Sequence, residues 1–314
     1  MPRLLRVVVL VLLVLLVSAF GYAAWRDPEH LVLNDEARAA APGKTLKLSQ
    51  GATHYEVAGD DTGRVVVLVH GFSVPSYIWD STFVALRAAG ARVIRYDLYG
   101  RGFSDRPDVA YDGAVYDRQL DDLLDSLHVR GPIDLVGLSF GGFVAAHYTG
   151  THPARIRTLT LVDPVSRARP LPTILTLPII GERVWQATTV PSMPDNQTSD
   201  FLHPQYWPRW SEQYRPQMQY KGFGRALLRS IVATSRTDFA SLYAAAGRSG
   251  RPVLLVWGKQ DQTVDIALSD IARRNIPQVQ FVPIDSSGHL PQMEQAATFN
   301  ATLLAFLAAH PVVP

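Results

Sequence analysis

The sequence predicts an α/β fold in which a mostly parallel central sheet carries helices on both faces. Short runs of Val, Ile and Leu alternate with segments of helical apolar spacing along most of the chain. Runs that are apolar throughout are typical of strands covered on both faces, as in parallel sheets. With 314 residues, 47% hydrophobic and 18% charged, the chain can form one large domain with an insertion or two small domains.

The N-terminal segment, residues 1–25, differs from the rest of the chain. Arg3 and Arg6 precede 19 uncharged residues, 7–25, which is close to the roughly 20 residues that span a bilayer as a helix. We therefore expect a membrane anchor here, with the remainder of the chain on the non-cytoplasmic side, because basic flanks stay in the cytoplasm. The alternative is a signal peptide cleaved near Ala19, which would leave a secreted or periplasmic protein.

A polar, alanine-rich connector follows at residues 26–44, and the globular core is expected at residues 45–164 and 237–314. Within this core, buried apolar runs bounded by Gly, Pro and Asp predict strands. The predicted strands lie at residues 45–48, 54–58, 65–69, 92–96, 132–138, 159–162, 252–257 and 279–284. Segments with helical spacing lie at residues 81–89, 115–127, 143–148 and 295–309. Strands that alternate with helices in this way predict parallel neighbours joined by helical crossovers.

Residues 165–236 interrupt the alternation before the penultimate strand. No buried strand is apparent there, and the segment holds eight of the chain's 22 prolines and three of its six tryptophans. Long insertions are more often functional than simple connections, and ligands bind beyond the carboxyl ends of strands in such sheets. We expect a helical lid over the strand ends, with substrate contacts from Trp185, Trp207 and Trp210. The alternative is a small packed subdomain without ligand contact.

The sequence Gly137-x-Ser139-x-Gly141 stands between a predicted buried strand and a predicted helix. A strand-to-helix turn this tight strains the backbone at its centre, and flanking glycines avoid side-chain collisions. Such a turn presents the serine hydroxyl beyond the sheet edge, next to a helix N-terminus. We therefore predict that Ser139 is a nucleophile.

A serine hydroxyl needs a base within hydrogen-bond reach, and the base needs a third group that orients it. Asp261 and His289 each follow a predicted buried strand, at the same edge of the sheet as Ser139. The order Ser, Asp, His along the chain is one of the known orders for such a triad. Asp265, four residues after Asp261, and Asp163, directly after another strand, are alternative acids.

Five motifs make residues 45–314 resemble the α/β-hydrolase superfamily, in its cap-bearing branch with a serine nucleophile. In chain order they are His70-Gly71-Phe72, Asp97-Leu98-Tyr99-Gly100-Arg101-Gly102-Phe103-Ser104, Gly137-x-Ser139-x-Gly141, Trp257-Gly258-x-x-Asp261 and Ser287-Gly288-His289. The resemblance implies the α/β-hydrolase fold, with a helical lid inserted before the penultimate strand.

The resemblance also implies a role for each candidate residue. Ser139 would attack a carbonyl carbon, His289 would accept and return its proton, and Asp261 would orient His289. The backbone N–H groups of Phe72 and Phe140 would form the oxyanion hole that stabilises the tetrahedral intermediate.

A serine nucleophile separates this chain from epoxide hydrolases and haloalkane dehalogenases, which resemble it elsewhere but attack with aspartate. We expect a serine hydrolase that cleaves a carboxylic ester of an apolar substrate through an acyl-enzyme, like an esterase or a monoacylglycerol lipase. The same fold also hosts carbon–carbon bond hydrolysis, peptide hydrolysis at an N-terminal residue and haloperoxidase-like chemistry. A non-catalytic binding protein is the alternative of another class, although such proteins usually lose a triad member.

Composition excludes several kinds of site. The chain has no cysteine, which rules out disulfides, thiolate catalysis and zinc–cysteine sites. A net charge of +2 without a clustered basic stripe gives no indication of nucleic-acid binding. We expect no cofactor and no metal. The expected partners are a small apolar ester and, through the N-terminal segment, a membrane, whereas no oligomeric state is predicted.

Overall fold

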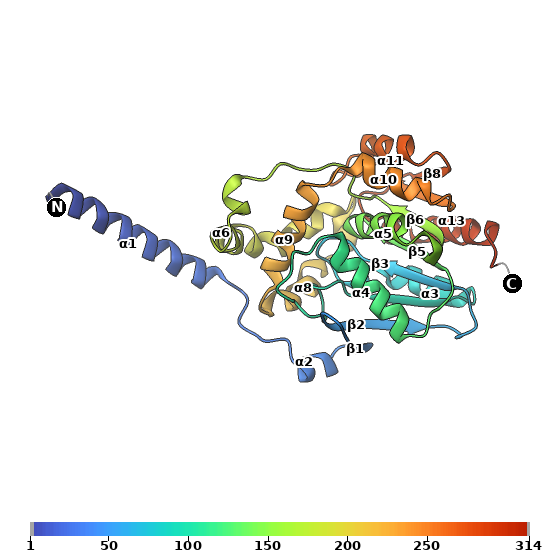
Figure 1. Ribbon diagram of the computed structural model, residues 1–314, viewed down its shortest axis with the longest axis horizontal. Helices are drawn as coiled ribbons and strands as arrows, with labels where there is room; N and C mark the ends of the chain where they lie inside the picture. The colour runs from blue at the N-terminus through green and yellow to red at the C-terminus, as the bar shows by residue number, and fades with distance from the viewer. Residues whose placement is uncertain (1–2, 313–314) are drawn as a thin grey trace.

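The computed structural model describes residues 3–312 and contains an eight-stranded sheet (Figure 1). The order across the sheet is β1-β2-β4-β3-β5-β6-β7-β8. Its strands are β1 (Lys44–Leu48), β2 (Gly51–Ala58), β3 (Val65–Val69), β4 (Arg92–Tyr96), β5 (Ile133–Leu138), β6 (Ile156–Val162), β7 (Val253–Gly258) and β8 (Val279–Ile284). β2 pairs antiparallel with β1 and β4, and all other neighbours are parallel. The mostly parallel sheet and each predicted strand are confirmed.

Side chains alternate between the two faces of the sheet, and helices cover both faces. Val67 and Val69 of β3 belong to one buried apolar cluster, whereas Val66 and Leu68 belong to the other. The first cluster lies under α4 (Gly113–Ser126), α5 (Phe140–Thr151), α10 (Phe239–Arg248) and α11 (Ser269–Asn275), and the second under α3 (Asp80–Ala88) and α13 (Ala296–Ala309). This two-sided burial explains why the strands are apolar throughout.

The chain between β6 and β7 forms a helical cap, in agreement with the insertion predicted before the penultimate strand. Its helices are α6 (Ile180–Thr188), α7 (Met193–Asn196), α8 (Trp210–Tyr214) and α9 (Phe223–Ser235). Within the described residues, no strand lies between β6 and β7. The apolar interior of the cap is continuous with the second cluster of the core, so the cap is packed onto the sheet rather than loosely attached.

The N-terminal helix α1 (Arg3–Arg26) extends away from the body of the protein, beside the cap helix α6 (Figure 1). The apolar stretch of this helix has a mean hydropathy of 2.8 and is not buried in the protein, so by length and composition the helix could cross a membrane. A short helix, α2 (Asp35–Ala39), follows within the predicted connector and begins at Asn34, whose side chain accepts a hydrogen bond from the Ala37 N–H. Residues 1–2 and 313–314, at the ends of the predicted N-terminal segment and core, lie outside the described residues.

Candidate active site

The candidate nucleophile Ser139 occupies the turn between β5 and α5. Its φ of 53° and ψ of −114° lie in a region that non-glycine residues rarely adopt. A side chain at Gly137 would place its Cβ 2.2 Å from the Gly141 carbonyl oxygen, and one at Gly141 would lie 2.4 Å from the carbonyl oxygens of Val69 and His70. Both glycines are therefore required for the chain to turn so sharply.

His289 and Asp261 form a buried pair on two neighbouring loops. His289 follows β8 and Asp261 follows β7, and the distance from His289 Nδ1 to the Asp261 carboxylate is 2.7 Å. The other carboxylate oxygen of Asp261 accepts hydrogen bonds from the N–H groups of Thr263 and Val264, at 2.8 and 2.9 Å. These bonds fix Asp261, which holds the imidazole through Nδ1, and within the described residues Nε2 has no hydrogen-bond partner.

His289 and Asp261 shift each other's pKa. Burial lowers the pKa of His289, but the charge and hydrogen bond of Asp261 raise it more, so the net pKa lies above that of an ordinary histidine. Burial raises the pKa of Asp261, but the charge and hydrogen bond of His289 lower it below the ordinary range. Each group therefore favours the charged form of the other.

The two alternative acids lie in different environments. Asp163 is fully buried and accepts a hydrogen bond from the Gly258 N–H at 2.8 Å. Burial, followed by the charge of Asp261, raises the pKa of Asp163 well above the ordinary range, which favours the neutral form of this carboxyl group. Asp265 is exposed and accepts a hydrogen bond from the Ala267 N–H. Of the three carboxylates, only Asp261 has a hydrogen bond to His289 within the described residues.

A cavity of about 160 Å³ joins the candidate nucleophile to the candidate base. One part of its wall is apolar and includes Leu138 and Leu290, and another part is polar and comes from the cap and the loop after β7. The lining residues are Gly71, Phe72, Ser73, Val74, Ile78, Leu138, Ser139, Asn196, Gln197, Asp200, Thr263, His289 and Leu290. Within the described residues the Ser139 hydroxyl has no hydrogen-bond partner, and such contacts often tighten only when substrate is bound.

The three tryptophans expected at the substrate lie elsewhere in the cap. Trp185 and Trp210 are buried in the second apolar cluster. Trp207 stacks on Phe201, with ring centroids 5.2 Å apart. None of the three lines the cavity at Ser139, so their rings pack the cap interior and the cavity provides no support for the expected substrate contacts.

The two predicted oxyanion donors lie at the entrance to α5 and in the loop after β3. Within the described residues, neither the Phe72 nor the Phe140 backbone N–H has a hydrogen-bond partner. Arg101 is fully buried below them, and its Nε donates to the Phe72 carbonyl oxygen at 2.8 Å. Its guanidinium also lies 5.2 Å from the centre of the Phe140 ring. Arg101 therefore fixes the loop that carries one donor and packs against the residue that carries the other.

His70 supports the same loop and is not available as a base. Its Nδ1 donates to the Gly71 carbonyl oxygen, and its Nε2 accepts from the Leu98 N–H, both at 2.9 Å. Burial is the main cause that lowers the pKa of His70 to about 4. The ring is therefore neutral at physiological pH, and both of its nitrogens are engaged.

A cap segment that sequence reasoning missed, residues 200–203, holds the histidine loop in place. The Asp200 carbonyl oxygen accepts from the His289 N–H at 2.8 Å. The Glu294 carboxylate accepts from the N–H groups of Leu202 and His203 with one oxygen, and from the Gly288 N–H with the other, at 2.7 Å. No motif marks Asp200 in the sequence, because its role arises only when the cap folds back onto the core.

The cap segment also contacts the loop that carries Asp261, and it leaves no space for a side chain at the residue before His289. Asp200 Oδ1 accepts from the Thr263 hydroxyl at 2.7 Å. A Cβ at Gly288 would lie 2.8 Å from the Asp200 carbonyl oxygen. The cap therefore bonds to both loops that carry the candidate acid and base.

Asp163, Asp261 and His289 also place one possible metal-ligand atom each within 4.8 Å of one another. A metal ion there would require an ionised Asp163 and a free His289 Nδ1. In the structure, Nδ1 of His289 is instead engaged by Asp261 at 2.7 Å, and this contact orients the imidazole.

Comparison with known proteins agrees with this geometry. A family model described as the alpha/beta hydrolase family matches residues 66–302. Lipase 3 of Moraxella sp. (strain TA144) is 25% identical over 266 residues, covering 80% of each chain. The putative carbamate hydrolase RutD of Variovorax paradoxus (strain S110) is 30% identical, covering 83% of this chain and 98% of its own.

A solved structure of a thermophilic esterase from Thermogutta terrifontis superposes with a TM-score of 0.72 and 26% identity, covering 86% of this chain and all of its own. The family match, the lipase and esterase relatives and the observed sheet with its cap all agree. This chain belongs to the alpha/beta hydrolase family and is an esterase- or lipase-like hydrolase.

Proposed function

We propose that the protein hydrolyses a carboxylic ester with Ser139 as nucleophile, His289 as general base and acid, and Asp261 as the group that orients His289. The observation that carries this proposal is the buried His289–Asp261 hydrogen bond of 2.7 Å. This bond leaves Nε2 as the nitrogen that could accept a proton, and His289 and Ser139 line the same cavity. This is the arrangement that serine activation needs.

The proposed reaction has two halves. Ser139 Oγ attacks the ester carbonyl carbon while its proton moves to His289 Nε2, and the carbonyl oxygen becomes an oxyanion. The N–H groups of Phe72 and Phe140 would stabilise this oxyanion, at about 3 kcal/mol for each donor. The intermediate then collapses, the alcohol leaves with the proton from His289, and an acyl-enzyme remains. Water activated by His289 attacks the acyl carbon and regenerates the Ser139 hydroxyl.

The cavity supports a small acyl group when the cap is closed. A volume of about 160 Å³ is below the roughly 300–1,000 Å³ typical of pockets for drug-sized ligands. Its apolar residues, Val74, Ile78, Leu138 and Leu290, suit an alkyl chain. A longer acyl ester would require movement of residues 196–200, which form the cap side of the cavity.

We further propose that α1 anchors the protein in a membrane, with the hydrolase domain on the non-cytoplasmic side. The supporting features are the length of the helix, its mean hydropathy of 2.8 and the basic residues before it. A cleaved signal peptide would instead release a secreted or periplasmic enzyme. Intact-mass measurement of protein recovered from its host membranes separates the two, because cleavage removes most of α1.

The nucleophile assignment is tested by labelling wild type and Ser139→Ala with a fluorophosphonate probe and by measuring turnover of p-nitrophenyl esters of increasing acyl length. We expect labelling only in wild type, and a loss of kcat of about 10⁴-fold or more in Ser139→Ala. Turnover should peak at short acyl chains because of the small cavity. Ester turnover that persists in folded, purified Ser139→Ala would contradict the proposal, and absence of turnover in folded wild type would favour a binding protein.

A further inference from the structure

The cap exposes a group of apolar side chains beside α1. Ile174, Leu177, Ile179 and Ile180, here called the cap apolar face, are 45%, 44%, 71% and 52% exposed. Single exposed apolar residues are common on soluble proteins, but contiguous groups mark surfaces that bind a partner. These four lie within seven residues of one another, at the start of α6.

The backbone of the cap apolar face is strained in a way that keeps an isoleucine exposed. Ile179, the residue before α6, has a φ of 63° and a ψ of −55°. A positive φ is a genuine outlier for a β-branched residue, because its side chain collides with the backbone there. Strain of this kind persists only where the surrounding structure enforces it, and it is frequent at functional positions. Here it accompanies the most exposed side chain of the face.

The residues directly after the N-terminal helix are hydrogen-bonded to the cap. Glu29 accepts hydrogen bonds from the N–H groups of Gly222 and Gly224, at 2.5 and 2.6 Å. Asp27, the residue directly after α1, accepts from the Gln186 side chain of α6 at 2.6 Å.

The backbone of Leu31 continues this attachment, bonding with Gln219 at 2.8 Å and with Lys221 at 2.9 Å. Residues 27–31, here called the tether, are therefore part of the cap. Wherever α1 leaves a bilayer, the cap must lie immediately outside it, because only one peptide bond separates Arg26 from the first tether contact.

The cap apolar face lies on the side of the molecule from which α1 emerges. The helix extends from the cap end of the body, next to α6 (Figure 1), and the two helices are in contact. The C-terminal part of α1 carries Tyr22 and Trp25, with ring centroids 6.0 Å apart, and such aromatic residues favour the membrane–water interface. The surface level of the bilayer would thus fall at the junction of α1 with the cap.

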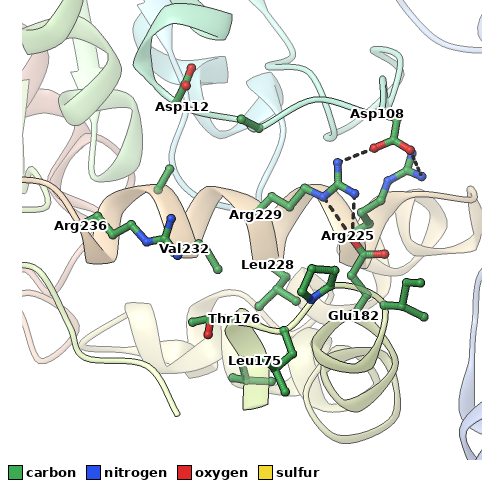
Figure 2. A pocket seen from close by; sticks show the side chains of 15 residues that line it. Asp108, Asp112, Leu175, Thr176, Glu182, Arg225, Leu228, Arg229, Val232 and Arg236 are labelled. Carbon is green, nitrogen blue, oxygen red and sulfur yellow. Dashed lines mark hydrogen bonds and ion pairs between the residues drawn. The ribbon is translucent and has the colours of Figure 1, made fainter. Parts of the chain in front are cut away.

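Ion pairs lie beside the face, in a groove that Leu177 and Ile179 of the face also line. Arg229 of α9 binds Glu182 of α6 at 2.9 Å and also pairs with Asp108 of the core. Figure 2 shows this bridge at one end of a groove of about 730 Å³, with Leu175 and Leu228 facing each other farther along it. The segment that presents the isoleucines is therefore fastened to both the cap and the core.

From these observations we infer that the cap apolar face docks on the lipid bilayer in which α1 is embedded. Ile174, Leu177, Ile179 and Ile180 would enter the region between headgroups and acyl chains, as the apolar residues of interfacial segments do. The inference rests on the membrane attachment proposed above and not on the hydrolytic reaction. Its consequence is that the cap, which forms one side of the cavity at Ser139, lies against the lipid surface.

The absence of cysteine from the chain allows a clean test. Full-length Ile179→Cys is labelled with an environment-sensitive nitrobenzoxadiazole dye and reconstituted into phosphatidylcholine vesicles, with and without lipids that carry a quencher on their acyl chains. Val84→Cys on α3 is the matched control, because Val84 is a β-branched apolar residue with 64% exposure on a helix remote from α1 (Figure 1). Ile180→Cys serves as a second reporter.

We expect a blue-shifted emission and strong quenching by the lipid-borne quencher for the dye at positions 179 and 180, and neither effect at position 84. Emission and quenching at both cap positions equal to those at position 84 would overturn the inference. Flotation of the same samples on a density gradient keeps the two proposals apart, because a protein that floats with the vesicles without contact between dye and lipid refutes only the docking.

A functional measurement supplies an independent readout. Ile179→Asp combined with Ile180→Asp should lower the rate on an ester dissolved in vesicles several-fold relative to the rate on a water-soluble ester, because these side chains are remote from the cavity at Ser139. An unchanged ratio between the two substrates would count against docking.

Discussion

At the scale of single residues, the two buried carboxyl groups near His289 have opposite properties. Asp261 accepts two backbone N–H groups as well as the imidazole, and His289 lowers its pKa despite burial. Asp163 accepts one backbone N–H and its pKa is raised, first by burial. A carboxylate with several donors stays ionised, whereas a carboxyl group with few donors and a charged neighbour keeps its proton. Only Asp261 is thus suited to stabilise an imidazolium.

We expect Asp261→Asn to lower kcat by about 10³- to 10⁴-fold, because the amide cannot hold the imidazole in the required tautomer or stabilise its charge. Asp163→Asn is the control, since asparagine resembles a neutral carboxyl group, and its kcat should change by less than about tenfold. Steady-state ester hydrolysis by the two folded variants shows which carboxyl group orients His289. A larger loss in Asp163→Asn would transfer the acid role to Asp163.

The pH dependence follows from the His289 pKa. A general base must be neutral, so kcat/KM should fall as pH decreases through a pKa that Asp261 holds above the ordinary value of about 6.5. The midpoint of this acid limb should move to lower pH in Asp261→Asn, because His289 then loses the charge and the hydrogen bond of Asp261, and Asp200 alone of the two carboxylates still opposes burial. A midpoint that stays in place would mean that another group controls the limb.

The candidate site residues that could be predicted are those that lie in short motifs directly after strands. Ser139 lies between glycines that its strained turn demands, and His289 and Asp261 follow strands in short motifs. Asp200 and Glu294 carry no local signal, because their partners are distant in sequence. The cap tryptophans do not line the cavity at Ser139, and the sequence alone could not show this, because an indole ring packs a cap interior as readily as it binds a ligand.

At the scale of elements, the cap and the loops that carry Asp261 and His289 form one hydrogen-bonded unit. Glu294, in the short helix α12 (Pro291–Glu294), accepts from cap residues with one oxygen and from the Gly288 N–H with the other. The position of the cap therefore controls the position of the histidine loop. A cap that moves to admit substrate must either carry these bonds along or break them.

We expect Glu294→Gln to lower kcat by about 10- to 100-fold while the fold is retained. Glutamine can keep the bonds of one oxygen, but its amide nitrogen cannot accept from Gly288, so the histidine loop loses a restraint. The rate of fluorophosphonate labelling should fall in parallel. Gln295→Ala is the control, because it removes a bond to the Ser286 carbonyl oxygen of the same loop without touching the cap. Equal kcat in wild type and Glu294→Gln would show that the coupling is absent.

The elements of the core were predictable because their signals are local. Buried runs such as Val65–Val69 are too short and too β-branched for helices, and the strand–helix alternation gave the sheet type. The cap was predictable only as a helical insertion. Its helices α7 and α8 are four and five residues long, and helices so short depend on tertiary contacts rather than on their own sequence.

At the scale of the whole molecule, a buried ion pair contributes a pH-dependent stability. His54 of β2 and Asp97, which follows β4, are 2.9 Å apart and almost fully buried. Burial lowers the pKa of His54, but Asp97 raises it more, so the net shift is upward. Burial raises the pKa of Asp97, but His54 lowers it below the ordinary range. The pair joins the antiparallel edge of the sheet to the loop that carries Arg101.

The sign of the effect follows from these shifts. A raised His54 pKa stabilises the folded state fully below the unfolded value of about 6.5, and this contribution is lost as pH rises through the folded pKa. We expect His54→Gln to lower the free energy of unfolding more at about pH 6 than at about pH 9. Urea denaturation at both pH values measures the difference. A loss of stability independent of pH would show that the pair is not charged in the folded state.

The tether has a practical consequence for the preparation of a detergent-free enzyme. An N-terminal truncation that begins at residue 27 removes the apolar helix α1 and keeps the hydrogen bonds of Asp27 and Glu29 to the cap. A truncation that begins at residue 44, where the sheet begins, removes Glu29, the acceptor for the Gly222 and Gly224 N–H groups, and exposes the cap surface that the tether covers. We therefore expect the truncated protein that keeps the tether, residues 27–31, to be more stable and to aggregate less during purification than the one that begins at residue 44.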